Sequence, residues 1–184
     1  MENRRPAPDR AALHEAALQH LARYAATEAG LLRVLERKIA RWVRESGAAA
    51  DEAVAAREAA REVARALAGS GVVDDAAFAE ARARRLLRGG HSRRAVVHHL
   101  ASKGVEQELA TRVLAATDDE FPAALAFARR RRIGPFRAGP VDEGGRQREM
   151  GALARAGFPR AVAERALNTA PDEAHAVLTQ FKQG

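Results

Sequence analysis

Repetition of one helical segment limits the fold of this chain more than any other feature of its sequence. The segment AVVHHLASKGV aligns with EMGALARAGF, so that Leu100 falls on Leu153 and Gly104 on Gly157. LLRVLERKI supplies a related, earlier segment. Short helical units that recur along a chain bury their apolar faces mainly against neighbouring units, and they therefore stack.

The composition favours helix along the whole chain. Apolar residues make up 47% of the 184 residues, much of this share is alanine, and aromatic residues make up only 4%. Alanine, leucine, arginine and glutamate all have high helix propensity. We therefore expect an all-α fold of tandem three-helix repeats that form an elongated, curved array.

Glycine, proline and capping residues divide this helical pattern into segments. Thr27, Asp51 and Ser92 are predicted N-caps, and either Asp74 or Asp75 caps the helix that follows them. The predicted organisation is a disordered tail over 1–12, a first three-helix repeat over 13–73, a second and basic repeat over 74–117, a third repeat over 118–170 with a Gly/Pro-rich insertion at 133–146, and a short C-terminal helix or tail over 171–184.

The net charge of +7 and the pI near 11.0 point to a polyanionic partner, such as nucleic acid or a nucleoprotein. On a helical wheel of residues 75–88 the predicted buried positions are Ala76, Ala79, Ala83, Leu86 and Leu87. The neighbouring arginines fall on the other sides of the same helix, where they can form a solvated basic face. The candidate partner-binding residues are Arg82, Arg84, Arg85, Arg88, Arg93, Arg94 and Lys103, with a second run at Arg129, Arg130, Arg131 and Arg132.

Several classes of chemistry are not expected. The chain contains no cysteine, and it has no phosphate-binding loop and no Ser-His-Asp pattern. His98 and His99 are adjacent, so their side chains diverge by about 100° on a helix and cannot chelate a metal together. Asp74 and Asp75 are interpreted as helix caps and not as catalytic carboxylates. We expect no enzymatic activity, no cofactor and no bound metal.

The sequence also predicts where the protein acts. The segment MENRRPAPDR lacks the apolar core of a secretory signal, and no run approaches the length of a membrane-spanning helix. We expect a soluble, cytoplasmic and monomeric protein.

Besides binding of a polyanionic partner, the residues leave two other functions open, namely sequence-directed DNA binding and a structural adaptor role. The segment SRRAVVHHLASKGVEQELATRVL has the spacing of a helix-turn-helix DNA-binding motif. Its second helix begins with Glu106 and Glu108, which suit a DNA groove poorly. We therefore expect at most weak, salt-sensitive DNA binding that does not depend on sequence. A direct, weakly sequence-specific DNA-binding protein of the helix-turn-helix type stays as the alternative. A purely structural helical adaptor would be unaffected by charge reversal of the arginines.

The stretch from Gly71 to Val105 resembles the RecX family of recombination regulators. The similarity includes the Asp-Asp-x-x-Phe-Ala signature that begins at Asp74, followed by Gly90, Ser92 and the Lys-Gly-Val turn. Weaker similarity extends it over roughly residues 18–168. One departure is that Ile39 follows Lys38 where a turn glycine would stand, so we expect this helix to run on to about Val43.

The resemblance implies both a fold and a function. Members of this family consist of tandem three-helix repeats and bind the RecA recombinase, usually as its filament on single-stranded DNA. They usually inhibit its ATP hydrolysis, strand exchange and co-protease activity. The chain is thus expected to regulate recombination, DNA repair and the SOS response through a RecA-type recombinase filament. The residues themselves leave stimulation open as well as inhibition.

Overall fold

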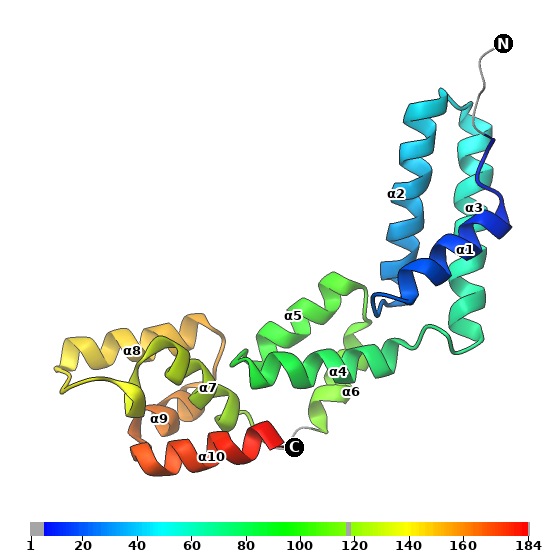
Figure 1. Ribbon diagram of the computed structural model, residues 1–184. Helices are drawn as coiled ribbons and strands as arrows, with labels where there is room; N and C mark the ends of the chain where they lie inside the picture. Colours follow the sequence, from blue (N-terminus) through cyan, green and yellow to red (C-terminus); the bar gives the residue numbers. More distant parts are fainter. Residues whose placement is uncertain (1–5, 117–118, 184) are drawn as a thin grey trace. The chain divides into compact units, whose positions relative to one another are not determined.

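The computed structural model describes residues 6–116 and 119–183, and all regular secondary structure in these two ranges is helical (Figure 1). The prediction of an all-α fold is thus confirmed. The helices are α1 (Arg10–Leu21), α2 (Glu28–Ser46), α3 (Ala50–Gly69), α4 (Asp75–Arg88), α5 (Arg93–Lys103), α6 (Gln107–Ala115), α7 (Phe121–Arg131), α8 (Glu143–Arg155), α9 (Arg160–Asn168) and α10 (Pro171–Gln183), with a 3₁₀ turn η1 at Gly134–Phe136.

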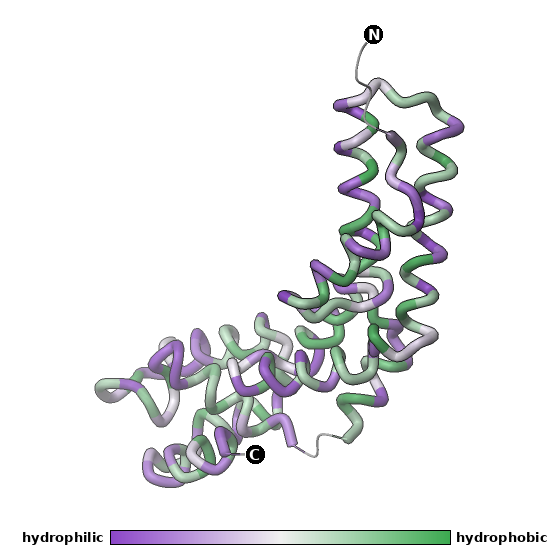
Figure 2. Tube along the Cα trace, turned by 45° about the vertical axis from the view of Figure 1, so that its right-hand side comes forward, coloured by the Kyte–Doolittle hydropathy of each residue, from purple (hydrophilic) through white to green (hydrophobic). Residues whose placement is uncertain are grey.

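The chain divides into two compact units. The first contains the residues up to Phe78 together with Lys103–Val105, and the second contains Ala79–Ser102 together with the residues from Glu106 onward. Apolar and polar residues alternate along the helices of each unit, as the colours in Figure 2 show. This is the pattern of helices that bury one face.

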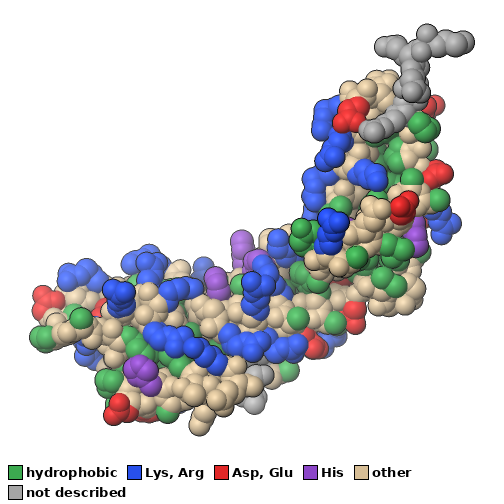
Figure 3. Space-filling view, in the orientation of Figure 1, with side chains coloured by type: hydrophobic (Ala, Val, Ile, Leu, Met, Phe, Trp, Pro, Cys, Tyr) green, Lys and Arg blue, Asp and Glu red, His purple; other side chains and the backbone are tan. Residues whose placement is uncertain are grey.

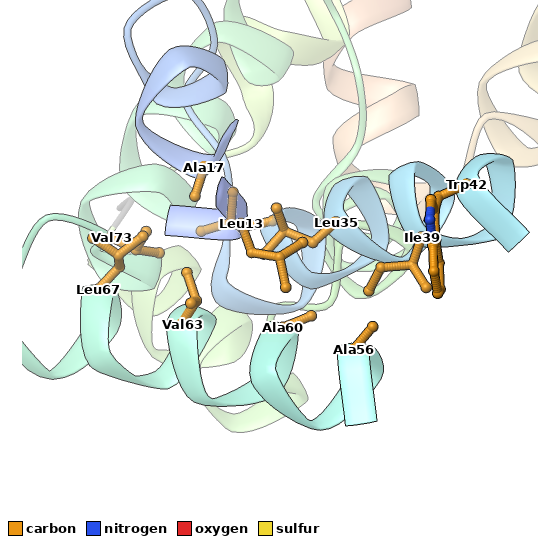
Figure 4. Packing of buried hydrophobic residues seen from close by; sticks show 11 residues of the cluster. Leu13, Ala17, Leu35, Ile39, Trp42, Ala56, Ala60, Val63, Leu67 and Val73 are labelled. Carbon is orange, nitrogen blue, oxygen red and sulfur yellow. The ribbon is translucent and has the colours of Figure 1, made fainter. Parts of the chain in front are cut away.

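The core of the first unit lies where α1, α2 and α3 pack together. Leu13 of α1, Leu35 of α2 and Val63 of α3 are buried in one cluster (Figure 4). Trp42 belongs to the same cluster and is only 6% exposed. Its large apolar side chain therefore contributes to packing, as a single buried tryptophan commonly does.

The central helix of the second unit is α7, which contacts α8, α9 and α10. Its residues from Ala123 to Ala128 are buried without interruption, as is Phe121. The Phe127 ring meets the Phe158 ring edge to face, with 5.6 Å between the ring centroids. A helix that is apolar on every side is stable only when neighbouring elements cover all of its sides. The covered part of α7 ends where its C-terminal arginines begin.

Two equivalent hydrogen bonds show what the repeated sequence encodes. The Thr27 hydroxyl donates to the Lys103 carbonyl within the first unit, and the Ser92 hydroxyl donates to the Ala156 carbonyl within the second, each at 2.6 Å. Each hydroxyl oxygen also accepts an N–H from the first turn of its own helix, α2 or α5. Both residues are therefore N-caps, as predicted, and each also binds the last turn of the helix that precedes an aligned glycine.

Carboxylates form a second pair of equivalent contacts beside these caps. Asp75 accepts the Glu28 backbone N–H at 2.8 Å, and Glu120 accepts the Arg93 backbone N–H at 2.6 Å. Asp74 accepts an N–H from the first turn of α4 at 2.9 Å. The acidic pair thus caps two different helices, α4 through Asp74 and α2 through Asp75, and negative charge is favourable at both N-termini.

The aligned glycines are required by close packing at the same junctions. A Cβ atom on Gly104 would lie 2.4 Å from the Ala29 Cβ, and one on Gly157 would lie 2.7 Å from the Ser92 Oγ. In each case the neighbouring residue belongs to the N-terminal end of the helix that the junction caps. Glycine recurs in the alignment because this approach leaves no space for a side chain.

Substitution Ser92→Ala is expected to lower the free energy of unfolding of the second unit by about 1–2 kcal/mol, because it removes an N-cap and leaves the carbonyl of the half-buried Ala156 without this donor. Urea denaturation followed by circular dichroism measures the change. Ser102→Ala is the matched control, because Ser102 is exposed and its hydroxyl donates to the His99 carbonyl in its own helix. A loss in the control equal to that in Ser92→Ala would contradict the junction role.

Several predicted boundaries were wrong because local caps shift the helix ends. The predicted tail over 1–12 is helical from Arg10, since Asp9 accepts the Ala12 N–H at 2.8 Å. The predicted cap Asp51 lies inside α3, which begins one residue earlier. There Glu52 accepts the Ala49 N–H and takes the capping role.

Two further boundaries differ from the prediction in the same way. The insertion predicted at 133–146 ends earlier, because Asp142 accepts the Gly145 N–H at 2.7 Å and begins α8 at Glu143. The helix predicted to run on to about Val43 continues to Ser46, where glycine ends it in a left-handed conformation.

The buried stripe of α4 is narrower than the helical wheel predicted. Ala79, Ala83 and Leu87 are buried, whereas Leu86 is half-buried and Ala76 is exposed. Ala76 belongs to the first turn of α4, before the packed part of the helix begins at Ala79. The arginines of this helix therefore border a narrow apolar seam.

Candidate partner-binding surface

The four arginines of α4 do not share one environment. Arg84, Arg85 and Arg88 are exposed, as the wheel predicted. Arg82 is half-buried, and its Nε donates to the His99 Nε2 of α5 at 2.9 Å. Arg82 therefore joins two helices of the second unit and is not part of the solvated face that the sequence predicted.

The basic residues of α5 also differ from one another in exposure and in contacts. Arg94 is exposed, but Arg93 is half-buried, and its Nε is buried without a hydrogen-bond partner among the described residues. Lys103 is exposed and belongs to the first unit, where its carbonyl accepts hydrogen bonds from Thr27 and from the Arg33 guanidinium. Lys103 and the arginines of α4 and α5 that face solvent thus lie in different units.

Two of the four arginines at the end of α7 are held by specific contacts. All four residues of 129–132 are exposed, and Arg132 ends the helix in a left-handed conformation. The Arg130 Nη1 donates to the Gly89 carbonyl at 2.7 Å. The guanidinium groups of Arg130 and Arg131 lie 5.6 and 5.7 Å from the centroid of the Phe127 ring, within the range of cation–π contact.

The contact between Arg130 and Gly89 joins two basic runs that are 41 residues apart in the sequence. The C-terminal ends of α4 and α7 meet there, and positive charge is favourable at both. Lysine and arginine side chains gather over these helices in Figure 3. We call this region the basic surface, and it consists of Arg85, Arg88, Arg129, Arg130, Arg131 and Arg132.

Most of the basic surface has no acidic counterpart in the part of the chain that the structure describes. Over residues 6–116 and 119–183, the side chains of Arg85, Arg88 and Arg129 make no ion pair or hydrogen bond. Among the described residues, the exposed Arg84 pairs only with Glu80 of its own helix, at 3.7 Å. The second unit also holds nearly all of the net positive charge. These guanidinium groups are available to phosphates or to carboxylates of another molecule.

One histidine beside the basic surface has a lowered pKa. Burial of the His91 ring, and secondly the charge of Arg130, lower the pKa of His91 below its ordinary value of 6.5. Protonation of His91 is therefore unfavourable beside the end of α7.

Acidification is therefore expected to destabilise the second unit slightly through His91. Between the folded pKa and about 6.5 the unfolded chain binds more protons than the folded chain, so this contribution is present above about pH 6.5 and is lost as the pH falls. Comparing urea midpoints at several pH values between about 5 and 8 tests this, with His91→Gln as the comparison. The variant should show a shallower pH dependence, and identical slopes would contradict the prediction.

Metal-binding clusters and membrane-spanning helices are not found in the part of the chain that the structure describes. Within these ranges, no three side chains of the metal-binding types lie together. None of the described helices is both long and apolar enough to cross a membrane.

Comparison with known proteins assigns the family. The profile described as "RecX, second three-helix domain" matches residues 74–114. The protein named "Regulatory protein RecX" of Myxococcus xanthus (strain DK1622) is 39% identical over 163 residues, which cover 86% of each chain. The chain belongs to the RecX family. The "Regulatory protein RecX" of Agrobacterium fabrum (strain C58 / ATCC 33970) is 37% identical over 101 residues, which cover 55% of this chain and 54% of the relative.

The RecX match contains several of the caps and turns described above. Residues 74–114 contain the acidic pair that caps α4 and α2, the Ser92 cap and the Gly104 turn. They also contain all the arginines of α4. The basic run of α7, which completes the basic surface, lies outside this match. Both relatives are named as regulatory proteins.

Proposed function

We propose that this RecX-family chain regulates a RecA-type recombinase by binding the filament that the recombinase forms on single-stranded DNA. Binding would reduce ATP hydrolysis, strand exchange and co-protease activity. The observation that carries the proposal is the 39% identity to a regulatory RecX protein over 86% of the chain. The regulator would act without catalysis of its own, as a cytoplasmic monomer.

The basic surface is proposed as the principal contact with the filament. Its six guanidinium groups project from the ends of two helices, and Arg130 is fixed there by the Gly89 carbonyl and the Phe127 ring. A guanidinium group that is held in place in this way loses less side-chain entropy on binding than a flexible side chain does. Arg84 and Arg94 extend the same proposal within the second unit, and Lys103 would make a separate contact from the first unit.

Filament binding can be separated from DNA binding by measuring both. A fluorescently labelled chain would be titrated with recombinase filament on single-stranded DNA, with the bare strand and with duplex DNA. We expect tight binding to the filament, and weak binding to both DNAs that falls steeply with salt. Equal affinity for filament and bare strand would instead favour direct DNA binding through α5 and α6. The acidic Glu108 in the first turn of α6 disfavours that alternative.

A further inference from the structure

A second surface feature lies beside the basic surface but differs from it in chemistry. A groove of about 360 Å³ opens between α4, the first turn of α7 and the last turns of α10, all within the second unit. Its apolar lining consists of Leu87, Pro122, Val177 and Phe181, and its charged lining consists of Arg84 and Arg88. α10 packs along α7, and Figure 1 shows its C-terminal end beside α7.

The apolar residues of the groove remain partly exposed. Leu87 is buried, but Pro122, Val177 and Phe181 are each half-buried. Val177 and Phe181 are four residues apart on α10 and therefore share one face of that helix. An open apolar groove bordered by charged residues is typical of a binding site for another molecule.

Both charged residues that line the groove, Arg84 and Arg88, are positively charged. Among the residues that the structure describes, no acidic side chain lines it. Arg88 makes no ion pair in the described part of the chain, and the side chains of Arg84 and Glu80 are each more than half exposed where they pair at 3.7 Å. An exposed pair of this length contributes little free energy, so Arg84 can exchange its partner readily. The groove thus offers two cations beside an apolar floor.

The spacing of the cations defines the partner further. Arg84 and Arg88 are one turn apart on α4, which separates them by about 6 Å along the helix axis. Carboxylates one turn apart on a helix, or two residues apart on an extended strand, have nearly the same spacing. The volume admits one or two large side chains and is at the small end of ligand sites.

We propose that this groove binds a short acidic segment of another protein, with one bulky apolar side chain inserted between Leu87 and Phe181 and two carboxylates paired with Arg84 and Arg88. A nucleic acid fits less well. Its phosphates would satisfy the arginines, but three of the four apolar residues are not aromatic and offer no stacking platform for a base. The proposal concerns partner chemistry alone and does not rest on recombinase binding.

The proposal can be tested on the full chain with a synthetic probe. The probe is a short fluorescein-labelled peptide with one phenylalanine flanked by glutamates at one-turn spacing, and fluorescence anisotropy reports its binding. Phe181→Ala is expected to weaken binding about tenfold, as loss of an anchor contact does. Arg84→Gln/Arg88→Gln is expected to weaken it about three- to tenfold. Phe181→Leu, which keeps an apolar side chain, should retain most of the affinity.

Matched controls make the outcome decisive. Arg61→Gln/Arg65→Gln removes two exposed arginines with the same spacing from α3 and should leave binding unchanged. A peptide with alanine in place of phenylalanine should bind weakly to every variant. No peptide binding, or equal binding by all variants, would overturn the proposal. Displacement of the peptide by oligothymidylate at lower concentration than by unlabelled peptide would assign the groove to nucleic acid and also overturn it.

Discussion

Gly90→Ala is expected to lower the free energy of unfolding of the second unit by about 2–5 kcal/mol, through backbone strain and overpacking together. A Cβ on Gly90 would lie 2.6 Å from the Phe127 backbone nitrogen and 2.9 Å from two further backbone atoms of α7. Gly90 also has a φ of 80°, which is unfavourable for any residue with a side chain. The added methyl group would therefore strain its own backbone and press against a neighbouring helix at once.

The atoms that this methyl group would meet are backbone atoms of α7, and for this reason the structure cannot accommodate it. A clashing side chain can rotate, but α7 is buried on nearly all sides and cannot move without disturbing the core of the unit. Thermal or urea unfolding of the full chain measures the loss. Gly139→Ala is the matched control in the same unit, because a Cβ there meets nothing within 4 Å. Equal stability of the two variants would show that α7 does not pack against Gly90 as described.

Reversal of three charges on the basic surface is expected to produce the largest functional loss. The variant Arg85→Glu/Arg88→Glu/Arg129→Glu should bind the recombinase filament at least about tenfold more weakly, because each change replaces an attraction with a repulsion. All three side chains are exposed and unpaired in the described part of the chain, so the fold should be retained. Filament binding by anisotropy, with circular dichroism as the folding check, measures the effect.

The control for this variant changes the same net charge elsewhere. Arg57→Glu/Arg61→Glu/Arg65→Glu alters three exposed arginines of α3 in the first unit. A general electrostatic effect would weaken both variants equally, whereas a specific contact would weaken only the first. Unchanged binding by the basic-surface variant would favour the adaptor function, in which these arginines only solubilise the chain.

Features that depend on near neighbours in the sequence could be predicted. Thr27 and Ser92 were predicted as caps because a hydroxyl before an apolar stripe bonds to its own first turn. The turn at Gly104 was predicted for a similar local reason, and Gly157 aligns with it. Each of these residues has a further contact, with a distant carbonyl or helix end, that no local pattern contains.

Contacts between residues far apart in the sequence could not be predicted. The helical wheel placed Arg82 on the solvated face because it could not include His99, which lies on the next helix. Glu149 is 9% exposed and pairs with Arg137, whose Nη2 lies 2.5 Å from its Oε2. A buried carboxylate of this kind needs a charged partner, and here a loop residue supplies it.

The basic surface could likewise be predicted only in those features that depend on neighbours in the sequence. Both basic runs were recognised from their charge, but as two separate patches. Their union depends on the hydrogen bond from Arg130 to Gly89, and periodicity contains no information about how α7 packs on α4. The groove beside α10 was missed for this reason as well, since its lining comes from three separate segments.

Single-stranded-DNA-dependent ATP hydrolysis by the cognate recombinase tests the central claim most directly. This chain would be titrated from substoichiometric to equimolar ratios, with DNA in excess so that competition for the strand cannot lower the rate. Regulation through the filament predicts strong suppression at substoichiometric ratios, and much weaker suppression by the basic-surface variant. An unchanged rate at equimolar protein would contradict the proposed regulation of the recombinase.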